Sequence, residues 1–214
     1  MKWISLRELQ GALVTVILII LGIMLLSNAL ERKALIDGDA LDINDILIED
    51  VSENIMLEGD LYANFGSFAE AYKTKNGVKR SASKYMYLIV IGDEFIGVQV
   101  KGDDIFEQME QQADDSFAYV NNETLATPQR IYIRGLVKRM DSEYYQYMKE
   151  YMVSMGFTNK EVDTYAYPYY IDTCYYEDWQ RMFWRSILCI VLGVAVIIII
   201  ILTARGRKSR GEQI

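Results

Sequence analysis

The sequence predicts an α+β fold, a small mixed sheet with two helices, placed between two transmembrane helices. Uncharged apolar runs cover residues 9–30 and 186–204, and each supplies the roughly 20 residues that a helix needs to cross a bilayer. Between them, strand-like and helix-like hydrophobic patterns follow one another. We therefore expect one folded domain over 54–176, joined to the first span by a connector over 31–53.

Positive charges beside the two apolar runs predict their orientation, because such residues are retained in the cytoplasm. The tails 1–8 and 205–214 hold Lys2, Arg7, Arg205, Arg207, Lys208 and Arg210. We expect a protein of the cell membrane with both termini cytoplasmic and residues 31–185 extracytoplasmic. The outer ends of the spans also carry positive residues that oppose this orientation, and snorkelling toward lipid phosphates accounts for them: Arg32, Lys33, Arg181 and Arg185.

The region between the spans is strongly acidic. Residues 34–180 hold 27 Asp and Glu against 12 Lys and Arg, a net charge of −15. An acidic domain between two basic tails belongs on the outer side. The tails are too short to fold, which excludes a histidine kinase, a cyclase or another cytosolic enzyme on the same chain.

A cleaved signal peptide is the alternative for the first run. Residues 13–26 have the length of its apolar region, and Ser27, Asn28 and Ala29 offer small residues for cleavage. The uncharged run is long for such a peptide, which favours a retained span. Both interpretations leave residues 34–180 outside.

Aromatic side chains gather at the ends of the spans, where amphipathic rings prefer the boundary between water and lipid. We expect interface anchors at Trp3, Tyr175, Tyr176, Trp179 and Trp184, most of them in or beside a juxtamembrane segment over 177–185. A stacking platform for a sugar or a peptide is the alternative.

Histidine is absent from the sequence, which excludes zinc hydrolases of the usual kind and Ser–His–Asp triads. The cysteines are Cys174 in the outer region and Cys189 in the second span, so the domain folds without an internal disulfide. We expect no metal, no cofactor and no nucleic-acid partner.

Alternating hydrophobicity predicts a strand over 54–62 and a hairpin of 84–91 and 95–101 around Gly92. The stretch 74–83 before the hairpin is expected to be a loop, and its basic side chains are candidates for binding an anionic polymer or lipid headgroup: Lys75, Lys79 and Arg80. Acidic residues 37–45 lack the spacing of an EF-hand and indicate a solvated linker.

A helix is predicted from Asp104, with Glu107 completing a capping box. A strand over 129–140 follows, and then a helix from Asp141 to Gly156. The alternating residues Tyr165, Tyr167 and Tyr169 predict a last strand, which Pro168 confines to a sheet edge. These tyrosines are also candidate binding residues.

Two resemblances follow from these elements. The glycine-containing strands Leu57-Glu58-Gly59-Asp60-Leu61 and Ile133-Arg134-Gly135-Leu136-Val137, with a hairpin and a helix between them, resemble an OB-type barrel. The layout of two spans around one outer domain, with a Tyr-rich stretch after Lys138-Arg139-Met140-Asp141, is similar to uncharacterised two-span membrane proteins of Gram-positive bacteria. The second resemblance implies no activity.

The leading functional hypothesis is a non-enzymatic extracytoplasmic binding or interaction domain, whose partners are the lipid bilayer and another membrane protein or envelope component. The alternative is an accessory subunit of a transporter or envelope complex, in which the spans make the contacts through small residues: Gly11, Gly22, Gly193 and Ala195. A third hypothesis is a carboxylate-based envelope hydrolase, for which the sequence singles out no pair of acids.

Overall fold

The computed structural model describes residues 6–75 and 78–211, with the side chains of 10–71, 84–102, 105–203 and 205–206. The chain divides into two compact units, one formed by 1–34 with 177–214 and the other by 35–176. Lys2 and Trp3 lie outside the described residues. Arg7, Arg207, Lys208 and Arg210 lie in helices, and their side chains are outside the described set.

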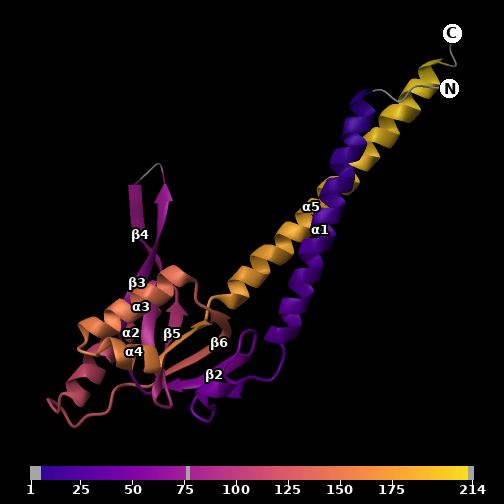
Figure 1. The fold of residues 1–214 in the computed structure, drawn as a ribbon. Helices are drawn as coiled ribbons and strands as arrows, with labels where there is room; N and C mark the ends of the chain where they lie inside the picture. Colours follow the sequence, from indigo (N-terminus) through magenta and orange to yellow (C-terminus); the bar gives the residue numbers. More distant parts are fainter. Residues whose placement is uncertain (1–5, 76–77, 212–214) are drawn as a thin grey trace. The chain divides into compact units, whose positions relative to one another are not determined.

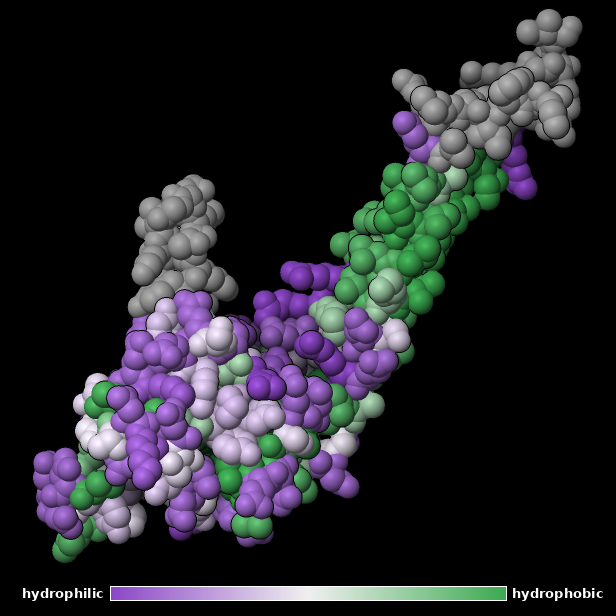
Figure 2. Space-filling model, viewed as in Figure 1, coloured by the Kyte–Doolittle hydropathy of each residue, from purple (hydrophilic) through white to green (hydrophobic). Residues whose placement is uncertain are grey.

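The first unit consists of two helices long and apolar enough to cross a membrane. They are α1 (Leu6–Ile36) and α5 (Tyr175–Gly211). The predicted juxtamembrane segment 177–185 is therefore a continuous part of α5. Figure 2 shows hydrophobic residues covering the surface of this unit along its middle.

Small side chains lie buried where α1 and α5 meet. They recur every seven residues, which places them on one face of each helix: Thr15, Gly22 and Ala29 on α1, and Ser186 and Gly193 on α5. A Cβ atom added to Gly22 would lie 2.6 Å from Cγ1 of Ile190 and 3.2 Å from its backbone nitrogen. We name this contact the helix seam.

The second unit holds a seven-stranded mixed sheet with the strand order β1-β2-β6-β7-β5-β4-β3. Its strands are β1 (Leu41–Asp42), β2 (Met56–Leu61), β3 (Asn64–Lys75), β4 (Val78–Ile91), β5 (Glu94–Val100), β6 (Ile131–Arg139) and β7 (Ala166–Asp172). Neighbours pair antiparallel except β1 with β2 and β5 with β7, which are parallel. The predicted hairpin is confirmed as β4 and β5 (Figure 1).

The sheet curls strongly, because two residues connect strands near its opposite ends. Tyr62 and Ala63 alone separate Leu61 of β2 from Asn64 of β3, so these two Cα atoms are at most about 11 Å apart. The inside of the curl is a core of mainly aliphatic side chains from five strands, including Leu57, Ile89 and Ile171. Helix α2 (Asp103–Val120) adds Met109 to this core.

Two helices cover the outer face of the sheet (Figure 1). These are α3 (Ser142–Ser154) and α4 (Asn159–Tyr165), and their contact with the sheet is rich in methionine. Its buried residues are Met86, Leu88, Met140, Met148, Met152, Val162 and Ala166. The strand β4 is therefore apolar on both faces, as its alternating pattern predicted.

Four local predictions were wrong. The strand with Pro168, β7, lies in the middle of the sheet rather than at its edge. Its parallel pairing with β5 is irregular between Phe95 and Gly97, close to Pro168, which has no backbone N–H to donate. Helix α4, beginning after Thr158, was not predicted and brings the helices of the second unit to three. The described residues of the stretch 74–83, which are 74–75 and 78–83, form the ends of β3 and β4 rather than a loop. Finally, α2 begins at Asp103 after Gly102, which takes the N-cap position with φ of 109°.

The connector is also more ordered than expected. The helix α1 continues to Ile36, β1 pairs with β2, and a 3-10 turn covers Ile48–Asp50. Side chains of Ile43, Ile48 and Val51 are buried in the inner core. Its acidic residues are solvated, but its isoleucines and valine belong to the domain.

Candidate functional site

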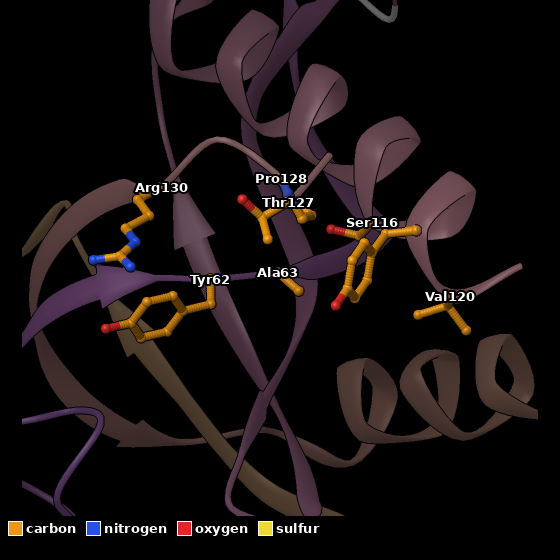
Figure 3. Close-up of a pocket in the computed structure, with 8 residues that line it drawn as sticks. Tyr62, Ala63, Ser116, Val120, Thr127, Pro128 and Arg130 are labelled. Carbon is orange, nitrogen blue, oxygen red and sulfur yellow. The ribbon is translucent and has the colours of Figure 1, made fainter. Parts of the chain in front are cut away.

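A recess lies at the turn between β2 and β3. Three segments line it: the turn itself, the last turns of α2, and the loop before β6. Its volume is about 240 Å³, and we name it the 62–130 recess after its outermost residues. Figure 3 shows Tyr62 and Arg130 on one side of the opening and Ser116 and Val120 on the other. The complete lining is Tyr62, Ala63, Ser116, Tyr119, Val120, Thr127, Pro128 and Arg130.

A buried polar network supports this recess from below. Asn64, Gln112 and Ser116 are each at most 1% exposed. The Gln112 amide nitrogen donates to the carbonyls of Leu61 (2.8 Å) and Gln129 (2.7 Å), and the Asn64 amide nitrogen donates to the Gln112 side-chain oxygen (2.9 Å). These hydrogen bonds hold the turn, α2 and the loop together, so the recess has rigid walls.

The rim of the recess exposes apolar and aromatic surface. The exposed fractions are 49% for Tyr62, 46% for Tyr119 and 59% for Val120. Leu125, in the loop between α2 and β6, is 96% exposed. A cluster of this kind on a folded surface is typical of a site that contacts another molecule.

Arg130 is the charged group of the recess. Its guanidinium carbon lies 4.6 Å from the centre of the Tyr62 ring, a cation–π contact. Of the residues that the structure describes, no carboxylate lies within ion-pair distance of Arg130. Stacking on the ring leaves the guanidinium edge able to donate in its own plane.

A second hollow, of about 450 Å³, is lined by residues of the segment 31–53 that was predicted to be a connector. Its acidic residues are Asp42, Asp45 and Asp50, all of them exposed. The Asp42 carboxylate accepts from the backbone N–H of Asn44 at 2.8 Å. A glycosidase needs one carboxyl in a desolvated setting, and exposure denies that setting to all three. Within the described parts of the chain, no group of three or more His, Cys, Asp or Glu side chains could hold a metal ion.

Among the described residues of the domain, each shifted pKa moves away from neutrality. Burial raises the pKa of Tyr87 and Tyr151, and a hydrogen bond to a glutamate raises the pKa of Tyr132 and Tyr147. A hydrogen bond to Asp163 raises the pKa of Lys149, and hydrogen bonds from Thr158 lower the pKa of Glu161. Acid–base catalysts need shifts in the opposite direction.

The candidate binding residues from the sequence do not gather in one place. Tyr165 ends α4, whereas Tyr167 and Tyr169 lie on β7 and pack against the inner core, with ring centroids 5.7 Å apart. The side chains of Lys75, Lys79 and Arg80 lie outside the described set, and the binding role predicted for them stays a prediction. None of the three tyrosines lines the 62–130 recess.

The predicted interface anchors divide into two groups. Tyr176 and Trp184 are exposed on α5, at 48% and 65%. Trp179 instead joins the two long helices, since its indole N–H donates to the carbonyl of Ala29 (3.0 Å) and the Lys33 ammonium lies 5.4 Å from its ring. Tyr175 is half-buried, and Arg205, one of the predicted topology residues, is exposed on α5.

Sequence reasoning missed the recess residues. Tyr62 and Arg130 are 68 positions apart in the sequence, and each follows or precedes a strand without forming a motif. An exposed tyrosine in a two-residue turn was the available signal, and it is too common to be specific.

Comparison with known proteins adds the family. No curated protein and no solved structure matches the chain. A family model described as Domain of unknown function (DUF8577) matches residues 5–204, which include α1, the whole sheet and α5 as far as residue 204. The chain therefore belongs to the DUF8577 family.

Proposed function

We propose that the chain is an integral membrane protein that holds residues 35–176 outside the cytoplasm as a non-enzymatic binding domain. The observation that carries this proposal is the 62–130 recess, with its rigid walls, exposed aromatic rim and stacked arginine. Recognition sites are enriched in tyrosine and arginine. The recess lining contains no aspartate, glutamate, histidine or cysteine that could act as acid, base or nucleophile.

The membrane part of the proposal is supported by α1 and α5. Both helices have the required length and hydropathy, and the helix seam supports a retained first span rather than a cleaved signal peptide. Because the small residues of the seam serve contacts within the chain, the outward faces consist mainly of leucine, isoleucine and valine. Such faces suit lipid, which favours the binding domain over the accessory-subunit hypothesis.

We also propose that the domain is an OB-like barrel. If β2 and β3 are counted as one bent first strand and the two-residue edge strand β1 is set aside, the remaining sheet begins and ends on that strand. The third and fifth strands, β5 and β7, are parallel, and α2 connects the third strand to the fourth. This arrangement matches the resemblance carried by the two glycine-containing strands.

The OB-like arrangement has a consequence for where a ligand binds. OB domains bind oligonucleotides and oligosaccharides on the face of the second and third strands, which here are β4 and β5. Helices α3 and α4 cover that face through Met148, Met152 and Val162. A binding surface of this domain therefore has to lie elsewhere, and the 62–130 recess is open.

Site-specific photocrosslinking in intact envelopes tests the binding function. A photoreactive residue at Leu125, in the loop whose Thr127 and Pro128 line the recess, should give a discrete crosslinked product that Val120→Asp abolishes. The matched control is a photoreactive residue at Val153, which is 44% exposed on α3 and should give no such product. Equal crosslinking at both positions, or none at either, would contradict the proposal.

Protease treatment tests the topology. Protease added to intact cells should digest residues 35–176 and leave α1 and α5 protected in the membrane. Digestion of this domain only after lysis would show that it faces the cytoplasm, contrary to the proposal.

A further inference from the structure

We infer that the 62–130 recess binds a protein segment in which an apolar side chain stands beside a carboxylate. This inference rests on the proposed function and names the partner class of the same site. It depends on the size of the recess, on its apolar lining and on the charge that Arg130 presents.

The recess is smaller than the pockets that usually hold cofactors or other small molecules. The recess holds about 240 Å³, whereas pockets for small molecules usually hold about 300–1,000 Å³. One inserted side chain of a partner fits a space of this size, and the rest of the partner would lie across the exposed rim. Val120 and Leu125 then become buried, which accounts for large apolar side chains that are 59% and 96% exposed in the free protein.

The positive charge of Arg130 favours a carboxylate beside the inserted side chain of the partner. The guanidinium of Arg130 is exposed and stacked on Tyr62 at 4.6 Å, and among the described residues it has no carboxylate partner. A carboxylate accepts two parallel hydrogen bonds from such a guanidinium. The domain around it is strongly acidic, with 27 Asp and Glu in 34–180, so an acidic segment is held at Arg130 and repelled elsewhere.

Tyr62 also borders another small hollow, distinct from the acidic one beside the connector, and this hollow extends the site. This hollow holds about 200 Å³ and is lined by Ile43, Asn44, Asp60, Leu61, Tyr62, Ala63 and Val90. Tyr62 and Ala63 line both spaces, so a segment crossing the turn between β2 and β3 contacts the two in succession. An extended peptide can do this, whereas a compact ligand fills one space alone.

Selection of a displayed random peptide library on the full chain in lipid nanodiscs tests this inference. Enriched peptides should carry an aliphatic or aromatic residue next to Asp or Glu. A synthetic peptide of the enriched sequence should bind at least tenfold more weakly to Arg130→Gln and to Val120→Asp. The matched controls, Arg139→Gln at the far end of β6 and Val153→Asp on α3, should leave its affinity unchanged.

Three results would overturn the inference: basic enriched peptides, equal binding to Arg130→Gln and the wild-type protein, or no enrichment. The photocrosslinking result separates these failures from failure of the proposed function. If Leu125 still gives its specific product, the domain is a binding module and only the partner class assigned here is wrong. If neither method finds a partner at the recess, both proposals fail. Near-ultraviolet circular dichroism of each variant verifies that it is folded.

Discussion

Removing the carboxylate of Asp172 should destabilise the domain more than any exposed ion pair does. Asp172 is fully buried and lies at the end of β7, three residues before α5. It accepts from the Lys138 ammonium, from the Gln99 side-chain amide (2.8 Å) and from the backbone N–H of Cys174 (2.9 Å). Asp172→Ala leaves all three donors without this acceptor.

The expected loss follows from the burial of these donors. A buried donor without an acceptor costs about 1–3 kcal/mol. The Cys174 N–H is buried and fixed by the backbone, whereas the Gln99 amide is part-buried and Lys138, which is 24% exposed, can turn its ammonium toward water. Counting the Cys174 donor in full, the Gln99 donor in part and the lysine little, we expect about 3 kcal/mol, at the lower end of the cost of breaking a buried ion pair.

Guanidinium unfolding of the full chain in a mild detergent, followed by near-ultraviolet circular dichroism, measures this loss. The matched control is Asp163→Ala, which removes the partner of Lys149 at 2.6 Å, where Asp163 is 69% exposed. An exposed pair of this kind contributes below about 1 kcal/mol. Equal losses in Asp172→Ala and Asp163→Ala would refute the argument from burial.

Three further predictions concern the helix seam, α4 and the end of α1. Gly22→Leu should separate α1 from α5, because its Cβ would lie 3.2 Å from backbone atoms of α5. After proteolysis of the domain, the two wild-type helices should copurify, and the two helices of the variant should not. Thr158→Ala should cost about 1 kcal/mol at pH 7 by removing the capping box of α4. Hydrogen bonds from the backbone N–H and the hydroxyl of Thr158 lower the pKa of Glu161 below its ordinary value of 4.5. The variant loses the hydroxyl bond to this carboxylate, whose contribution is present above pH 4.5 and fades as the pH falls through the lowered pKa. The difference in unfolding free energy between wild type and variant should therefore be smaller at pH 3 than at pH 7, and a constant difference would contradict the assignment. Arg134→Ala removes the guanidinium that donates to the carbonyls of Ile36 and Gly38 (3.3 and 3.4 Å). Limited proteolysis should then cut near residue 38 several times faster than in the wild-type protein. An unchanged cleavage rate would contradict this prediction.

Local periodicity predicted the elements whose side chains have a clear inside and outside. The hairpin of β4 and β5 follows from strict alternation, and α3 follows from its N-cap, where the Asp141 carboxylate accepts from the backbone N–H of Tyr144 at 2.9 Å. The parallel pairing of β5 with β7 could not be predicted from a local pattern, since its partners are about 70 residues apart in the sequence. Pro168 was misjudged because an irregularity in that pairing accommodates its missing N–H.

Helix α4 and the order of the connector each had a signal in the sequence, but a stronger neighbouring pattern favoured another interpretation. Thr158 and Glu161 have the spacing of a capping box, but the alternating tyrosines that follow favoured a strand. The connector was dominated by its aspartates, although Ile43, Ile48 and Val51 carried the hydrophobic signal of a buried segment. The 62–130 recess could not be predicted at all, because it exists only where three distant segments meet.

The two faces of the sheet differ in how they will tolerate change over evolution. Inside the curl, isoleucine and valine predominate, and their branched side chains have few alternative rotamers. Beneath α3 and α4, the unbranched residues Met86, Met140, Met148 and Met152 fill the space, and methionine adapts its shape to its neighbours. Substitutions should therefore accumulate faster under the helices than inside the curl of the sheet, so that relatives keep the same interior while their outer layer diverges.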